Sequence, residues 1–159
     1  MIYEKKLLKL TQWTTNLERP RLTANLIVIH WIGPYPTQTV YDVRHWWEID
    51  PNYHSAHYTA KGPKVLQTME ENQVAYHAGD SRNYSAIGIE VVPATQGGDF
   101  AEDTIATLAE LCAGIRERWT IKDILRRYDG VQKKDCPRFY CPQTKGDGRW
   151  MDLKARLIA

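Results

Sequence analysis

Two short apolar runs stand out along the chain and predict the centre of a β-sheet. Residues 26–29 are all apolar and mostly β-branched, and the run ends at His30 just before a Gly-Pro turn. Residues 87–92 form a second run, interrupted only by Gly88 and Glu90. Strands that are buried on both faces of a sheet read as nearly continuous apolar runs. Both segments are therefore predicted to be buried central strands.

Other segments show the periodicity of amphipathic helices. In residues 101–119, apolar side chains recur at steps of three and four, which places them on one helical face. Helices are predicted at residues 39–49, 101–119 and 150–158, and shorter strands at residues 55–60, 64–69 and 124–128. Strands that alternate with helices indicate an α/β fold, with a mixed central β-sheet flanked by helices.

Length and charge narrow the class of protein. No repeat or linker-like stretch divides the 159 residues, so residues 1–159 are interpreted as one domain with an irregular lead-in at residues 1–24.

The net charge of +2 provides no strong basic field, so no nucleic-acid partner is expected. Apolar runs fall far short of the roughly 20 residues that span a bilayer, so no membrane insertion is expected. The N-terminus lacks the apolar stretch of a secretion signal, which predicts synthesis as a cytoplasmic protein.

The aromatic composition is unusual, with 6 Trp and 9 Tyr against 2 Phe. Trp and Tyr each combine a flat apolar face with a polar group, which suits a wet groove that grips sugars or peptides. The alternative is that these side chains fill a small core and its rim. The sequence leaves both interpretations open.

Three residues are candidates for chemistry because of their positions. His30 ends a buried strand, where open α/β sheets carry their sites, although such a histidine can also simply cap a core strand. Glu90 is either exposed at the rim or buried, and burial would raise its pKa toward that of a general base. Cys136 follows two lysines, whose charge lowers a thiol pKa and favours the thiolate that binds metals. A nucleophilic cysteine and an inert loop thiol are the alternatives for Cys136.

Three more residues have simpler expectations. His77 lies where a strand gives way to a loop and is predicted to contact substrate. His57 alternates within a predicted strand and is expected to be packed. Cys112 falls on the apolar face of the long helix and is expected in the core.

Five short motifs follow one another along the chain. They are Ile27-Val28-Ile29-His30, Ser55-Ala56-His57-Tyr58, Tyr76-His77-Ala78-Gly79, Ala86-Ile87-Gly88-Ile89-Glu90 and Lys134-Asp135-Cys136-Pro137. In this order and at these separations they resemble the type-2 N-acetylmuramoyl-L-alanine amidases, a family that includes phage endolysins and peptidoglycan recognition proteins. The resemblance runs from about residue 24 to the helix that begins near Arg149-Trp150. It implies a mixed sheet flanked by helices, with zinc-dependent hydrolysis of the amide bond between N-acetylmuramic acid and L-alanine.

The resemblance also implies roles for individual residues. His30 and Cys136 match two zinc ligands of the family. Glu90 matches a catalytic carboxylate, and Lys134 matches a lysine that assists catalysis in some members. His77, together with Trp and Tyr side chains, would then hold the glycan and stem peptide.

One position departs from the family pattern. Where the family usually reads Arg-His-Tyr-Asp, this chain reads Arg126-Arg127-Tyr128-Asp129, and the missing histidine is the remaining zinc ligand. A guanidinium stays protonated and has no lone pair for a metal. Either Asp129 substitutes from the same strand face, or the site binds metal weakly, or Arg127 is an introduced change. If this segment is misaligned, the next candidate ligands are His57, His77 and Asp135.

Three functions therefore compete. The first is an endolysin-type amidase that acts on bacterial peptidoglycan as a monomer and reaches the cell wall with the help of another factor; whether a cell-wall-binding domain follows Ala159 in a longer form is left open. The second is a peptidoglycan-binding module without activity, which Arg127 favours and the retained Glu90 and Lys134 oppose. The third is a cysteine hydrolase that uses Cys136 with a histidine partner.

Overall fold

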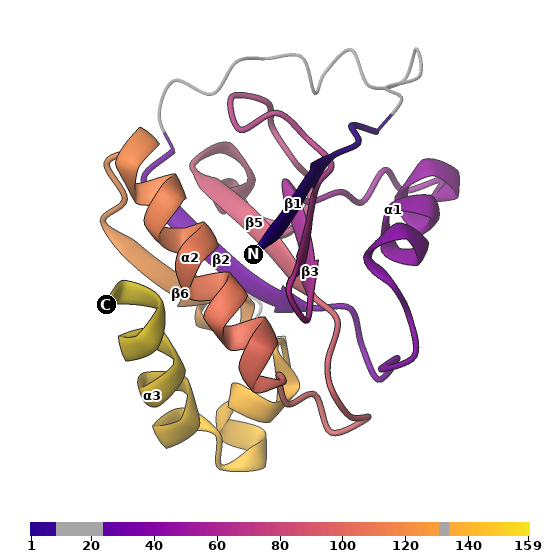
Figure 1. Cartoon of the computed structure of the whole chain (residues 1–159). Helices are drawn as coiled ribbons and strands as arrows, with labels where there is room; N and C mark the ends of the chain where they lie inside the picture. The colour runs from indigo at the N-terminus through magenta and orange to yellow at the C-terminus, as the bar shows by residue number, and fades with distance from the viewer. Residues whose placement is uncertain (9–23, 131–133) are drawn as a thin grey trace.

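A computed structural model describes residues 1–8, 24–130 and 134–159 and contains one six-stranded sheet (Figure 1). The strands are β1 (Ile2–Lys5), β2 (Leu26–Trp31), β3 (Tyr58–Lys61), β4 (Lys64–Gln67), β5 (Ala86–Val91) and β6 (Asp123–Arg126). Their order across the sheet is β1-β4-β3-β5-β2-β6. Neighbouring strands run parallel except for the antiparallel hairpin of β3 and β4. The predicted mixed sheet is confirmed, and its two apolar runs lie side by side at β2 and β5.

Three α-helices flank the sheet, as the sequence predicts. They are α1 (Val40–Ile49), α2 (Glu102–Arg118) and α3 (Asp147–Ile158). Helices α2 and α3 pack together over one face of the sheet, and α1 lies to the side of β3 (Figure 1). Thr39 caps α1 by accepting a hydrogen bond from the backbone N–H of Asp42. Within the described ranges, no helix combines the length and apolar character that crossing a bilayer requires.

One face of the sheet carries the candidate catalytic side chains, and the other face packs into the apolar core. His30 lies opposite Glu90, and Glu90 lies opposite Thr59, so these three side chains share one face. Ile29 and Tyr58 alternate with them and point to the other face, where they join the apolar core beneath α2 and α3. Cys112 of α2 also belongs to that core, as expected. The candidate chemistry therefore lies on the sheet face opposite the main core.

The predicted irregular lead-in is wrong for residues 2–5. These residues form β1, which pairs in parallel with β4 from Ile2 opposite Lys64 to Lys5 opposite Gln67. The strand lies at the edge of the sheet and its side chains are mostly exposed. An exposed edge strand carries no apolar run, which is why the pattern missed it. The rest of the lead-in, residues 9–23, lies outside the described residues.

Three short strands are also shorter than predicted. β3 begins at Tyr58 instead of residue 55, and β4 ends at Gln67 instead of residue 69. β6 ends at Arg126, and Arg127–Asp129 form a 3-10 turn. In that turn the Asp129 carboxylate accepts hydrogen bonds from the backbone and the side chain of Arg126. These bonds stop the strand early and turn Asp129 back toward Arg126.

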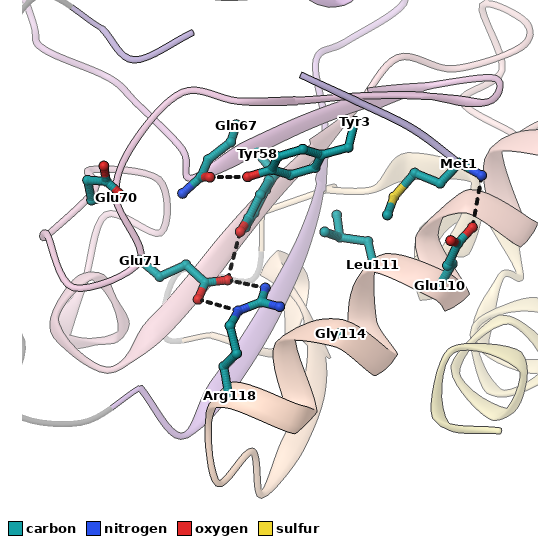
Figure 2. Close-up of a pocket in the computed structure, with 10 residues that line it drawn as sticks. All are labelled: Met1, Tyr3, Tyr58, Gln67, Glu70, Glu71, Glu110, Leu111, Gly114 and Arg118. Carbon is teal, nitrogen blue, oxygen red and sulfur yellow. Dashed lines mark hydrogen bonds and ion pairs between the residues drawn. The ribbon is translucent and has the colours of Figure 1, made fainter. Parts of the chain in front are cut away.

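A pocket of about 430 Å³ opens on the core face of the sheet, between β1, β3, β4 and α2 (Figure 2). At its wall the Glu71 carboxylate accepts hydrogen bonds from the Tyr58 hydroxyl at 2.7 Å and the Arg118 guanidinium at 2.8 and 3.1 Å. The Trp119 indole N–H donates to the same carboxylate at 2.7 Å. Burial opposes ionisation of Glu71, but these hydrogen bonds together outweigh it and lower its pKa. This network ties β3 to the C-terminal end of α2.

Candidate functional site

Three residues that the sequence singles out meet at the ends of β2 and β5. His30 Nδ1 lies 3.8 Å from Glu90 Oε1. Cys136 Sγ lies 3.8 Å from the same nitrogen, although 106 residues separate the two along the chain. The backbone N–H of Trp31 donates to this sulfur at 3.5 Å. Two strand ends and one loop therefore converge on the Nδ1 edge of the His30 ring.

His77 determines which nitrogen of His30 carries the proton. His77 Nε2 lies 3.3 Å from the Ala86 carbonyl oxygen, which can only accept, so this nitrogen donates. In neutral His77, Nδ1 is then the acceptor, and it lies 2.9 Å from His30 Nε2. His30 therefore donates through Nε2, and the lone pair of its Nδ1 points toward Cys136 and Glu90.

Gly88 makes room for this arrangement. A Cβ at position 88 would lie 2.5 Å from Cγ of His77, so the imidazole ring packs directly on the β5 backbone. From the other side, the Asn83 side-chain oxygen accepts hydrogen bonds from the backbone N–H groups of His77 and Ala78. The ring of His77 thus packs on β5, while the Ser81–Tyr84 3-10 turn holds its backbone.

Burial dominates the electrostatics of the cluster. It lowers the pKa of His30 well below the ordinary value, and the charge of Arg127 acts in the same direction. Burial raises the pKa of Glu90 to about 8, against a smaller opposing effect of Arg127. It also raises the pKa of Cys136, aided by the Glu90 charge. The expectation that neighbouring lysines lower the thiol pKa is therefore wrong, because desolvation of a buried sulfur outweighs nearby exposed charge.

Arg127 stands beside this cluster without joining it as a ligand. Its Nε and Nη2 donate to the Ala78 carbonyl oxygen at 3.0 and 2.7 Å. Its own carbonyl oxygen accepts from Arg82 at 3.2 Å. The side chain is thereby tied to the loop that carries His77, with a guanidinium that offers donors only.

The other suggested third ligands are engaged elsewhere. Asp129 pairs with Arg126 at 2.9 Å, which removes it as a substitute from the same strand face. His57 accepts from the Gly88 N–H at Nδ1 and lies 3.0 Å from the Gln73 carbonyl at Nε2, so it is packed as expected. Asp135 lies 3.5 Å from Arg138.

The cluster fits zinc chemistry for two ligands. Zinc binds imidazole nitrogen and thiolate sulfur, and His30 Nδ1 and Cys136 Sγ supply one of each. Glu90 Oε2 is buried with no hydrogen-bond partner in the described structure, a state that a nearby cation would compensate. In the ranges 1–8, 24–130 and 134–159, however, no group of three or more His, Cys, Asp or Glu side chains is placed to hold a metal. The third ligand that catalytic zinc sites usually have is thus missing from the described residues.

A cavity of about 420 Å³ lies next to the cluster. Its lining residues are mostly polar and come from three loops: Asn52, His54, Tyr76, His77, Gly79, Asn83, Arg127 and Lys134. Lys134 brings an exposed ammonium group to it, and the largely buried His77 connects it to His30. Tyr76 is the one Tyr or Trp lining it among the described residues, so the predicted aromatic groove is wrong here. Other aromatics, such as Tyr58 and Trp150, lie in the core.

Sequence reasoning placed His30, Glu90 and Cys136 in one site but missed two supporting contacts. The first is the packing of His77 on Gly88, although a glycine inside an apolar strand run does mark a close approach. The second is the bond from Arg127 to Ala78, which brings together segments 49 residues apart and leaves no local pattern.

Comparisons with known proteins agree with the resemblance. A sequence model of the family described as N-acetylmuramoyl-L-alanine amidase matches residues 20–139. A curated relative from Bacillus licheniformis, a probable N-acetylmuramoyl-L-alanine amidase, is 30% identical over 148 residues. The match covers 82% of this chain and 40% of the relative, so the chain spans less than half of that protein's length.

Two solved structures share the fold. PlyL has a TM-score of 0.78 and 16% identity, with 99% of this chain and 97% of that one covered. The catalytic domain of XlyA has a TM-score of 0.73 and 19% identity, with 99% of each chain covered. At these identities the likeness concerns the fold, and it extends over the described sheet and helices.

Proposed function

Because this chain belongs to the N-acetylmuramoyl-L-alanine amidase family, we propose that it hydrolyses the amide bond between N-acetylmuramic acid and L-alanine in bacterial peptidoglycan. The observation that carries the proposal is the convergence of His30, Glu90 and Cys136 beside a polar cavity. All three residues lie within the matched range, residues 20–139.

In this proposal His30 and Cys136 hold a zinc ion. The tautomer set by His77 directs the His30 Nδ1 lone pair to the position that a ligand needs. When bound, zinc supplies a Lewis acid for the amide carbonyl and lowers the pKa of water. Because Arg127 contributes no lone pair, we expect the ion to be held less firmly than in a three-ligand site.

Glu90 is proposed to move the proton. Its buried Oε2 has no hydrogen-bond partner among the described residues, so this oxygen is available to take a proton from water and pass it to the leaving amine. Lys134 is proposed to stabilise the negative charge that develops on the carbonyl oxygen, because its ammonium group lines the adjacent cavity.

His77 is proposed as a substrate contact, in a more restricted form than the sequence alone predicts. Both of its ring nitrogens lie within hydrogen-bond distance of other groups, His30 and the Ala86 carbonyl. The residue is about 8% exposed, so only a small part of it, where it lines the cavity, can touch a muramyl peptide. We expect the chain to act on the cell wall as a monomer, after another factor releases it.

A peptidoglycan-binding module without activity is the second candidate function. Arg127 favours it, because a positive charge stands where the third zinc ligand is expected. The cysteine hydrolase is disfavoured, because the raised pKa of the buried Cys136 thiol opposes formation of a nucleophilic thiolate.

Metal analysis combined with a cell-wall lysis assay separates these functions. We expect the purified chain to lyse cell walls, to lose activity in a chelator, and to regain it on addition of zinc. Lysis that persists in the chelator, with no zinc detected, would contradict the zinc proposal. Co-sedimentation with cell walls without lysis at any zinc concentration would establish the binding module instead.

A further inference from the structure

Two positive charges line the cavity beside the cluster without an acidic partner. Arg127 and Lys134 both line it, and neither forms an ion pair with a carboxylate in the described part of the chain. The nearby Arg82 is different, because its guanidinium binds Asp80 at 2.8 Å. His54, which also lines the cavity, lies 2.5 Å from Asp50. The charge left over in the cavity is therefore positive.

Arg127 is held in a fixed position while it keeps its full charge. Its two hydrogen bonds go to the Ala78 carbonyl, which orients the guanidinium plane without neutralising it. The effect of this charge reaches the reaction centre, since it acts on the pKa of both His30 and Glu90. A fixed cation with free donors is suited to a planar anion such as a carboxylate.

We propose that Arg127 makes this cavity a subsite for a free carboxylate on the stem peptide, next to the amide bond that is cleaved. The inference rests on the proposed function, in which Lys134 stabilises the negative charge that develops on the carbonyl oxygen. Arg127 is then the second positive charge of the cavity, and it is available for another group of the substrate. In peptidoglycan stems, the α-carboxyl group of the glutamate residue that follows L-alanine is either free or converted to a carboxamide. Arg127 then selects the free form, because a guanidinium binds a carboxylate more strongly than a neutral amide.

Two synthetic ligands that differ in one group provide the probe: N-acetylmuramoyl-L-alanyl-D-glutamate, with a free α-carboxylate, and the corresponding D-isoglutamine, with an α-carboxamide, both with the γ-carboxyl group capped as a methylamide. Binding is measured by calorimetry at two salt concentrations on the Glu90→Gln chain, which keeps both ligands intact. We expect the acid to bind about 10-fold more tightly than the amide at low salt. The difference should shrink at high salt, because the cavity is open to solvent.

Substitutions at position 127 assign the preference to this residue. Arg127→Gln should reduce the preference for the acid over the amide to less than about 2-fold. Arg127→Lys should keep part of this preference because the charge remains. Arg156→Gln on α3 is the matched control, since it removes an exposed arginine that does not line the cavity. It should leave the preference for the acid unchanged. Repeating the measurement in the presence of a chelator excludes the alternative that the ligand carboxylate binds to a metal ion instead of to Arg127.

The outcomes are distinct from those of the proposed function, because binding is measured without hydrolysis. Equal affinity for acid and amide, an undiminished preference in Arg127→Gln, or no binding of either ligand at millimolar concentration would each overturn the subsite. The amidase proposal would stand or fall separately, on cleavage by the chain with Glu90 in place.

Discussion

The Nδ1 atom of His77 lies 2.9 Å from Nε2 of His30, and this contact sets the tautomer of the histidine at the centre of the site. The Ala86 carbonyl makes His77 a donor at Nε2, which makes its Nδ1 an acceptor from His30. A residue behind the site thus decides which face of His30 is available for chemistry.

The first prediction concerns the space beneath His77. Gly88→Ala places a Cβ at 2.5 Å from the His77 ring, which must shift and lose its contact with His30. We expect zinc affinity to fall about 10- to 100-fold, as for other supporting contacts of metal ligands. Overpacking should also lower the free energy of unfolding by about 1–3 kcal/mol. Gly114→Ala in α2 is the control, because its Cβ would meet only the Arg118 side chain, at 3.4 Å. Unchanged zinc affinity in Gly88→Ala would contradict this role.

The second prediction concerns the tautomer directly. Nitrogen-15 NMR of the metal-free chain should show His30 protonated at Nε2 and unprotonated at Nδ1. In His77→Ala the acceptor is lost, and we expect a mixture of the two tautomers or the reverse one. His54→Ala is the comparison, because His54 is exposed and pairs with Asp50. A native chain with the proton on His30 Nδ1 would refute the assignment.

The third prediction is that Arg127 limits metal binding. Arg127→His removes a positive charge that acts on His30 and puts an imidazole at the position where the family pattern has its remaining zinc ligand. We expect zinc affinity to rise at least about 10-fold, and lytic activity to rise where metal loss limits it. Competition with a zinc chelator measures the affinity. If the native chain already holds stoichiometric, chelator-resistant zinc and the variant gains nothing, the third ligand lies elsewhere.

The fourth prediction concerns the network on the core face of the sheet (Figure 2). Glu71→Gln should lower the free energy of unfolding at pH 7 by about 2 kcal/mol, because Arg118 and Tyr58 lose a charged acceptor. The pKa of Glu71 is lowered by folding, so its ionised form stabilises the fold above the unfolded-state value of about 4.3. This stabilisation is lost as the pH falls through the lower folded-state pKa.

Urea unfolding at pH 7, 5 and 3.5 tests the sign. The difference between the native chain and Glu71→Gln should narrow as the pH falls below about 4. Glu110→Gln, a substitution in the same pocket at an exposed side chain, should cost less than about 0.5 kcal/mol at every pH. A difference for Glu71→Gln that stays constant across this range would contradict the account.

Much of the fold could be predicted because the elements that form its centre have strong local patterns. The apolar runs of β2 and β5 and the periodicity of α2 need no distant contact to be seen. β1 escaped prediction because it is an exposed edge strand whose stability comes from pairing with β4. The end of β6 was misplaced because Asp129 bonds back to Arg126, a competition that the apolar pattern does not show.

The candidate site also has features that the sequence shows and features that appear only in the folded chain. His30 and Glu90 became candidates because they end apolar strand runs, and only the resemblance to the family brought them together with Cys136 in one site. The high pKa of Cys136 could not, because the sequence shows the neighbouring lysines but not the burial of the sulfur. The position of Arg127 depends on a carbonyl 49 residues away, which only the folded chain brings near.

The most direct test of the account is the chemical identity of the bond that is cut in purified peptidoglycan. Mass spectrometry of the digest should reveal intact glycan strands and free stem peptides with new amino groups on L-alanine. In Glu90→Gln this product should form about 10²- to 10⁴-fold more slowly, with zinc supplied equally to both chains. Cleavage within the glycan or the peptide, or a Glu90→Gln chain as active as the native one, would contradict the account.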